Sequence, residues 1–151
     1  MPTVTPFLWF DSQAEEAMNL YASIFPRAKV LTVNSAQGRV MSVEFELEGQ
    51  KFMAMNAGPH HKFNEAVSFF VGCDTQQEID DYWAKLTANG GEPGRCGWLK
   101  DKFGLSWQIV PKSLGRLMSS GDAIKSKRVM DALLRMNKLD VKALQQAFDG
   151  D

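Results

Sequence analysis

The sequence has little cysteine, almost no net charge and no long apolar run, and each shortage excludes a class of protein. Neither of its two cysteines belongs to a Cys-x-x-Cys pair, which argues against a zinc or thioredoxin-type site. No stretch approaches the roughly 20 apolar residues that cross a bilayer. With 17 basic and 18 acidic residues, the formal net charge of −1 offers no electrostatic basis for binding nucleic acid or an anionic membrane.

The first ten residues, MPTVTPFLWF, lack a basic segment before their apolar residues, so we expect no secretory signal and a cytoplasmic location. In that compartment Cys73 and Cys96 are expected to be reduced, partly buried thiols. A length of 151 residues, 44% of them hydrophobic, fits one domain or two small halves that share a core.

An internal repeat organises the chain. Residues 11–16 read DSQAEE and residues 74–79 read DTQQEI, which is an offset of 74 − 11 = 63 residues. Both contain the spacing of a capping box, in which a hydroxyl and an acid satisfy free N–H groups at the start of a helix. The pairs are Ser12 with Glu15 and Thr75 with Glu78.

The segments around the two caps match in the same order. A short aromatic strand precedes each predicted helix, and three extended segments follow it. The extended segments are 30–34, 40–47 and 51–56 in the first half, and 92–95, 98–100 and 105–110 in the second. We therefore predict an α+β protein with two βαβββ modules that form one domain. Its parts are module one (1–57), a linker (58–65), module two (66–112) and a helical tail (113–151).

The tail has helical spacing of apolar residues, with Asp122 and Asp140 as plausible N-caps. We expect its helices to cover a sheet edge or a subunit surface.

Four longer stretches resemble the PhnB-like family, often described as 3-demethylubiquinone-9 3-methyltransferase, over nearly the whole chain. They are FMAMNAGP, FNEAVSFFVGCDTQQEIDDYWAKL, GGEPGRCGWLKDKFGLSWQIVP and VMDALLRMNKLDVKALQQA. The two βαβββ modules resemble the vicinal-oxygen-chelate superfamily of glyoxalases, bleomycin-resistance proteins and dioxygenases, of which the PhnB-like family is one branch. The resemblance implies a glyoxalase-like curled mixed sheet, a cavity between the modules and a homodimer.

Strand alternation indicates which side chains would face that cavity. In the last strand Leu105, Trp107 and Ile109 share an apolar face, and Ser106 and Gln108 share a polar one. The predicted cavity residues are Asn56, Ser68, Phe70, Trp98, Ser106 and Gln108. They would bind a small, mostly uncharged organic molecule. No general base is placed there, so no catalytic residue is assigned.

The turn that precedes the last strand, Asp101–Gly104, holds two residues with possible chemistry. Asp101 is expected to cap the turn through its side chain. Cys96 enters the hairpin without a histidine to activate it, so we do not expect it to act as a nucleophile.

The resemblance also implies a metal site, but this chain lacks its ligands. Gln108 stands where related proteins have a ligating Glu, and Pro6 stands where they have a His. We predict no metal and no cofactor. If His60 or His61 bound a metal together with Glu65, the protein could be a metal-dependent glyoxalase- or dioxygenase-type enzyme, which is one alternative. A homodimeric interaction module is a second alternative.

Direct methyl transfer is not expected, because the glycine-rich segment NGGEPGRCG follows a predicted helix and does not precede one.

Overall fold

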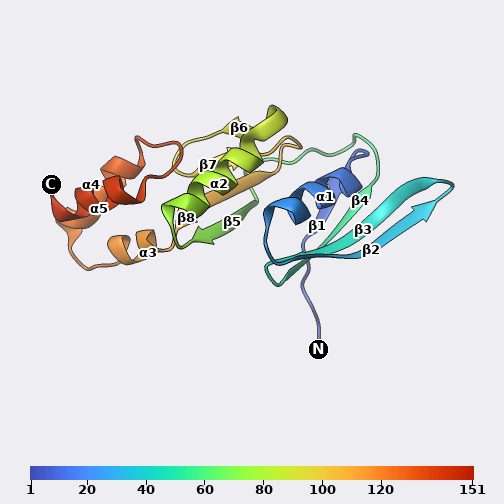
Figure 1. Cartoon of the computed structure of the whole chain (residues 1–151), viewed down its shortest axis with the longest axis horizontal. Coiled ribbons are helices and arrows are strands. Elements are labelled where there is room, and N and C mark those ends of the chain that lie inside the picture. Colours follow the sequence, from blue (N-terminus) through green and yellow to red (C-terminus); the bar gives the residue numbers. More distant parts are fainter. The chain divides into compact units, whose positions relative to one another are not determined.

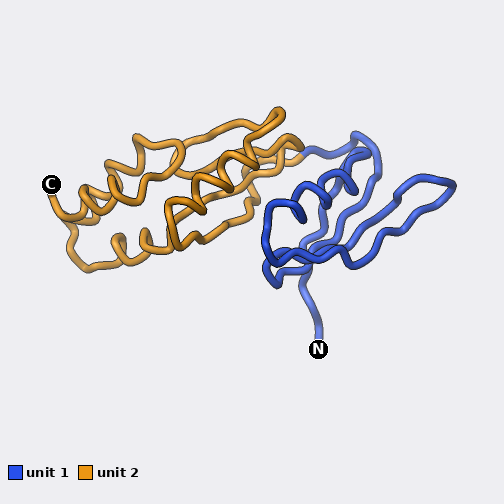
Figure 2. The backbone as a smooth tube through the Cα atoms, viewed as in Figure 1, with its two compact units in different colours: residues 1–62 blue, residues 63–151 orange.

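A computed structural model describes residues 1–151, and the chain divides into two compact units (Figures 1 and 2). Unit 1 comprises residues 1–62 and unit 2 comprises residues 63–151. The division falls inside the segment 58–65 that separates the two sequence repeats. Each unit contains one four-stranded sheet.

Unit 1 has the element order β-α-β-β-β. Its strands are arranged β1-β4-β3-β2, with β1 parallel to β4 and the other neighbours antiparallel. The elements are β1 (Phe7–Phe10), α1 (Ala14–Ile24), β2 (Ala28–Ala36), β3 (Arg39–Leu47) and β4 (Gln50–Asn56). The strand β2 extends two residues beyond each end of the predicted segment 30–34.

Unit 2 repeats this topology in the order β5-β8-β7-β6, with β5 parallel to β8. Its elements are β5 (Ser68–Cys73), α2 (Gln76–Thr87), the 3-10 turn η1 (Ala88–Gly90), β6 (Glu92–Pro93), β7 (Trp98–Lys100) and β8 (Ser106–Pro111). The predicted α+β class and the duplicated βαβββ pattern are confirmed. The strand β6 ends at Pro93, two residues before the end of the predicted segment 92–95, and the chain turns at Arg95, whose carbonyl accepts from the Trp98 N–H at 3.0 Å.

In each unit a single helix covers one face of the sheet. In unit 1, Val43, Phe45 and Phe52 lie buried on the side of α1, and the two phenylalanine rings stack with centroids 5.3 Å apart. In unit 2, Trp107 and Ile109 are buried on the side of α2. The apolar face predicted for the last strand is therefore confirmed. The opposite face of each sheet has no helix of its own unit over it (Figure 1).

The tail forms three helices: α3 (Ser113–Met118), α4 (Ala123–Leu133) and α5 (Val141–Asp149). They enclose a small core of Val110, Leu117, Val129, Leu139 and Leu144. Gln76, the first residue of α2, links the tail to this helix. Its Nε2 donates to the Leu139 carbonyl at 3.0 Å, and its Oε1 accepts from the Val141 N–H at 2.8 Å. No helix of the chain combines the length and apolar character that a membrane crossing requires.

The predicted helix caps are right at three starts and wrong at one. Thr75 accepts from the Glu78 N–H, and Asp122 and Asp140 cap α4 and α5. Ser12 does not cap α1, whose N-cap position is Gln13. Asn56, at the end of β4, takes that role instead: its Oδ1 accepts from the Ala14 N–H at 2.8 Å, and its Nδ2 donates to the Val40 carbonyl at 3.1 Å. The local sequence could not indicate a cap supplied from 42 residues away.

This cap predicts different costs for two substitutions. Asn56→Ala should lower the free energy of unfolding by about 1–2 kcal/mol, because the Ala14 N–H at the start of α1 and the Val40 carbonyl near the start of β3 each lose a partner. Ser12→Ala should lower the free energy of unfolding by only a few tenths of that amount, because Ser12 does not cap the helix. Urea denaturation followed by tryptophan fluorescence, with hydrogen exchange at the Ala14 amide, measures both. Equal losses in the two variants would show that Asn56 is not the cap.

Candidate functional site

The open face of the sheet in unit 2 brings together most of the predicted cavity residues. Strand register places two rows of side chains across it. The polar row consists of Ser68, Ser106, Lys100 and Glu92. The aromatic row consists of Phe70, Gln108 and Trp98. Five of the six residues predicted from strand alternation thus share one face.

The polar groups of this face differ in whether they have a hydrogen-bond partner. The Gln108 Nε2 donates to the Ser68 Oγ at 2.9 Å and links the rows. The Ser106 Oγ is buried and has no hydrogen-bond partner. Buried hydroxyl groups are nearly always paired, so the unpaired Ser106 Oγ stands out among the polar groups of this face.

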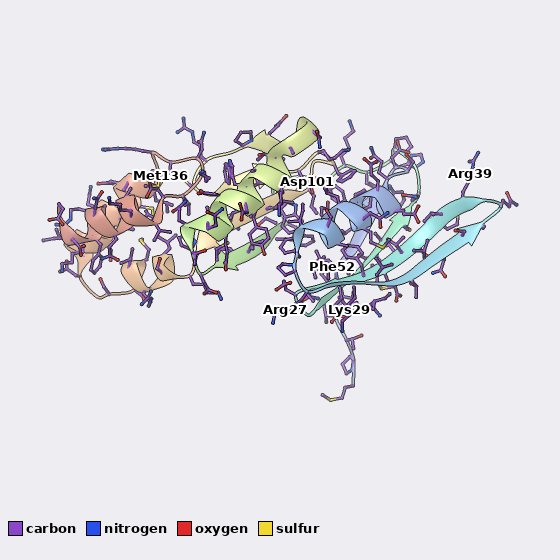
Figure 3. The ribbon with its side chains drawn as sticks, in the orientation of Figure 1. Arg27, Lys29, Arg39, Phe52, Asp101 and Met136 are labelled. Atoms are coloured by element: carbon purple, nitrogen blue, oxygen red, sulfur yellow. The ribbon has the colours of Figure 1, made fainter.

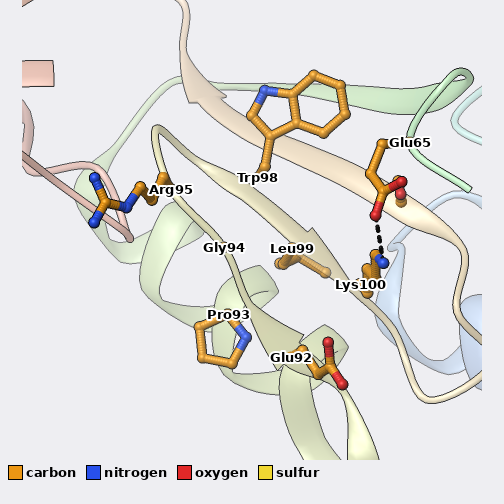
Figure 4. Close-up of a pocket in the computed structure, with 9 residues that line it drawn as sticks. Glu65, Glu92, Pro93, Gly94, Arg95, Trp98, Leu99 and Lys100 are labelled. Atoms are coloured by element: carbon orange, nitrogen blue, oxygen red, sulfur yellow. Dashed lines mark ion pairs between the residues drawn. The ribbon is translucent and has the colours of Figure 1, made fainter. Parts of the chain in front are cut away.

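A cavity of about 400 Å³ opens over the polar row (Figure 4). It lies within unit 2, and Ser106 is part of its wall. Its other chemically active lining residues are Glu65, Glu92, Arg95, Trp98 and Lys100. The combination of one aromatic wall with a few convergent polar groups is typical of small-molecule sites.

An ion pair between Lys100 and Glu65 sets the charge at the cavity (Figure 4). The hydrogen bond from Lys100 lowers the pKa of Glu65, and the same bond raises the pKa of Lys100, with a further contribution from the charge of Glu92. Both groups are therefore charged at neutral pH. Glu65 is a weak base in this state, and Lys100 lacks the free amine that a nucleophile needs.

Asp101 holds the β7–β8 hairpin in the register that builds these rows. Its Oδ1 accepts from the N–H groups of Phe103 and Leu105, and its Oδ2 accepts from the Trp107 indole N–H at 2.9 Å. Asp101 belongs to unit 2 and is only 2% exposed. The predicted turn cap is confirmed. Its bond to Trp107 ties the turn to the helix-covered face of β8.

Asn56 is the one predicted cavity residue that the open face of unit 2 does not contain. It belongs to unit 1, and both ends of its amide are bonded to the backbone. It borders a separate cavity of about 660 Å³ beside the start of α1, together with Asp11, Glu15 and Arg39.

The residues of the chain do not fit the metal site that the resemblance implies. Gln108 offers a neutral amide that is bonded to Ser68. No group of three or more His, Cys, Asp or Glu is placed to hold an ion. The rings of His60 and His61 pack edge-on against Trp9, with centroids 6.5 and 4.7 Å away.

Both cysteines are free thiols. Cys73 is buried at the end of β5, and this burial raises the pKa of its thiol to about 11. It is therefore protonated at neutral pH and is a poor nucleophile. Cys96 is half-buried, and its N–H donates to the Met136 carbonyl of the tail at 2.8 Å.

The cavity predicted from the sequence left out the charged part of this site: Glu65 entered only as a possible metal ligand, and Lys100 was expected to be exposed. The signal for Lys100 was present, because Trp98 and Lys100 alternate with Leu99 in the same way that Gln108 and Ser106 alternate with Trp107. Glu65 carried no such signal, since it lies in a turn outside any strand and reaches the cavity only in the folded chain.

Comparison with known proteins adds a family to this geometry. The sequence model of the family described as 3-demethylubiquinone-9 3-methyltransferase matches residues 2–110. The PhnB protein of Bacillus cereus is 32% identical, with a TM-score of 0.66 over 73% of this chain and 99% of its own. A protein of Pseudomonas aeruginosa is 17% identical, with a TM-score of 0.61 over 74% and 98%. A gene product of Arabidopsis thaliana is 18% identical, with a TM-score of 0.53 over 72% and 98%.

The last two structures are too distant to indicate more than the fold. No curated protein matches the chain. The matched segment ends at residue 110, so the motif quoted for residues 129–147 lies outside it and the helices α3–α5 are an addition to the shared core.

Proposed function

Because the chain belongs to the 3-demethylubiquinone-9 3-methyltransferase family of PhnB-like proteins, within the glyoxalase and bleomycin-resistance superfamily, we propose that it binds a small organic molecule. The binding site is the cavity over the polar row of unit 2. The family resemblance found in the sequence is confirmed, and the cavity of unit 2 supports the proposed binding. No catalytic residue is proposed.

The unpaired Ser106 hydroxyl is the observation that carries this proposal. A buried hydroxyl without a partner costs about 1–3 kcal/mol of folding free energy. Such a cost is common at functional sites, where stability is given up for a group that a ligand will pair with. The cavity beside Ser106 has the volume of a small ligand, and Trp98 offers that ligand a flat apolar surface.

Methyl transfer does not follow from the family name. A donor such as S-adenosylmethionine is commonly held where a glycine-rich loop leads from a strand into a helix. Here the glycines of the 90–97 segment lie between α2 and β7, and both sheets are mixed. Binding without methyl transfer therefore agrees better with the topology.

A thermal-shift screen against phenols, quinones, dicarbonyls and phosphonates tests the binding proposal. A ligand at 100 times its Kd should stabilise the protein by about 2.7 kcal/mol. Ser106→Ala should unfold at the same or a higher temperature than the wild type, because it removes an unsatisfied group, and should lose most of the ligand-induced shift. Ser35→Ala, at an exposed serine of β2, is the control and should keep the full shift. A flat response of the wild type to every compound would count against the site.

We also propose that the protein works without a bound metal. Purified, untagged protein should contain no stoichiometric Fe, Mn, Ni or Zn, and EDTA should leave its unfolding temperature unchanged, because Gln108 offers a neutral amide where a carboxylate ligand is needed and no three His, Cys, Asp or Glu side chains converge. Elemental analysis measures this. One equivalent of metal that is lost in His60→Ala or His61→Ala would support the metal-dependent alternative instead.

The homodimer stays a proposal, and β2 is the surface that favours it. This edge strand is exposed along nearly its whole length, and it carries Val30, Leu31 and Val33 at 49%, 43% and 41% exposure. Arg39 is the first residue of β3 after the β2–β3 turn, and its side chain points away from the strands (Figure 3). An apolar edge of this kind is prone to pair with another strand, here β2 of a second copy.

Light scattering after size exclusion tests the dimer. The wild type should show about twice the 16.9 kDa of one chain. Leu31→Lys should shift the mass toward 16.9 kDa. Gln77→Lys, which places the same charge on the exposed side of α2, should not. A monomeric wild type would overturn this part of the proposal.

A further inference from the structure

The cavity of unit 2 already holds a carboxylate that belongs to the chain itself. Glu65 comes from the turn before β5 and forms an ion pair with Lys100 over the polar row (Figure 4). Its side chain is 61% exposed, and it is held at the cavity by this ion pair. Glu65 therefore shows which chemical group Lys100 accepts at this position.

The Glu65 carboxylate satisfies only part of the polar row. Ser106 is the direct register partner of Lys100 on the neighbouring strand, which places their Cα atoms about 4.5–5.5 Å apart. Lys100 is paired, whereas the Ser106 Oγ has no partner. One carboxylate has two oxygens and can accept from both donors at once, but Glu65 is anchored in the chain and reaches only Lys100.

Exchanging Glu65 for a ligand costs little. An exposed ion pair contributes little to stability, so its loss is a small term. A ligand carboxylate that bonds to Lys100 and Ser106 together gains a charge-assisted hydrogen bond and pairs a buried hydroxyl.

The charges that line the cavity lead to the same ligand. While Glu65 is paired with Lys100, the two acids Glu65 and Glu92 balance the two bases Arg95 and Lys100. When Glu65 leaves, one acid faces two bases, and this lining favours a single negative charge. Trp98 lies two residues before Lys100 on the same face, about 6.6 Å along the strand, where it can stack against the rest of the ligand.

On the basis of the proposed binding function, we propose that the natural ligand is a small organic acid whose carboxylate replaces Glu65 on Lys100 and bonds to Ser106. Its apolar or aromatic body lies against Trp98. Glu65 acts as an internal competitor that occupies the anion position while the ligand is absent. This extends the expectation of a mostly uncharged ligand, because one charged end is now assigned.

Matched pairs of acids and amides test the assignment. We would measure binding of benzoate and benzamide, phenylacetate and phenylacetamide, and 2-naphthoate and 2-naphthamide by calorimetry and ligand-observed NMR at low salt. Each acid should bind the wild type about 10-fold or more tightly than its amide, because a hydrogen bond to a charged group contributes about 1.5–3 kcal/mol.

Three variants separate the roles of the residues. Lys100→Met should weaken acid binding about 10-fold or more and leave amide binding within twofold. Glu65→Gln should strengthen acid binding about two- to fivefold, since the competing carboxylate is gone. Ser106→Ala should weaken acids and amides alike. Lys102→Met, at an exposed lysine of the same hairpin, is the control for unspecific attraction of anions.

The outcomes distinguish the two proposals. If no acid or amide binds and no compound of the wider screen shifts the unfolding temperature, both the binding function and this inference fail. If amides or other neutral compounds bind with dependence on Ser106 but acids bind no better, the binding function stands and the organic-acid assignment is wrong. The assignment is also wrong if Lys102→Met weakens acid binding as much as Lys100→Met does, or if Glu65→Gln weakens it.

Discussion

One helix can cover only one face of the four-stranded sheet that it accompanies, and this constraint shapes both units of the protein. In each βαβββ unit the apolar side chains of alternating strand positions lie beneath the helix. The other face is left without cover from its own unit. In unit 2 this face carries serine, glutamine and lysine next to phenylalanine and tryptophan, and this composition favours a binding surface over a second core.

The organisation of that face depends on the hairpin between β7 and β8. Asp101 ties the turn to Trp107 on the buried side, so packing under α2 determines the register on the open side. This register places Lys100 opposite Ser106 and Trp98 opposite Gln108. The tail supports the same region, because its residues Met136 and Asn137 accept hydrogen bonds from the segment just before β7. The open face of this sheet is thus supported by α2, which packs on the opposite face, and by the tail, which bonds to the segment before β7.

How far the sequence led depended on the distance between partners along the chain. Thr75 and Glu78 are three residues apart, and the predicted cap is present. The turn cap at Asp101 bonds to residues two and four positions away, and it too was predicted. Ser12 had an equally good local pattern, yet the start of α1 is capped by Asn56 from the end of β4. A local motif indicates that a segment can cap its own helix, but a side chain from a distant part of the chain can form that cap instead.

By itself, the sequence determined the two repeats, the α+β class, the faces on which the side chains of β5 and β8 lie, and the family. These follow from the twofold alternation of strands and from caps formed by near neighbours, which are properties of short segments. The tertiary structure alone decided that Glu65 would reach Lys100, that Asn56 would be committed to α1, and that the Ser106 hydroxyl would be buried without a partner. Each of these depends on groups that chain folding brings together from distant positions, so no pattern within a single segment could indicate them.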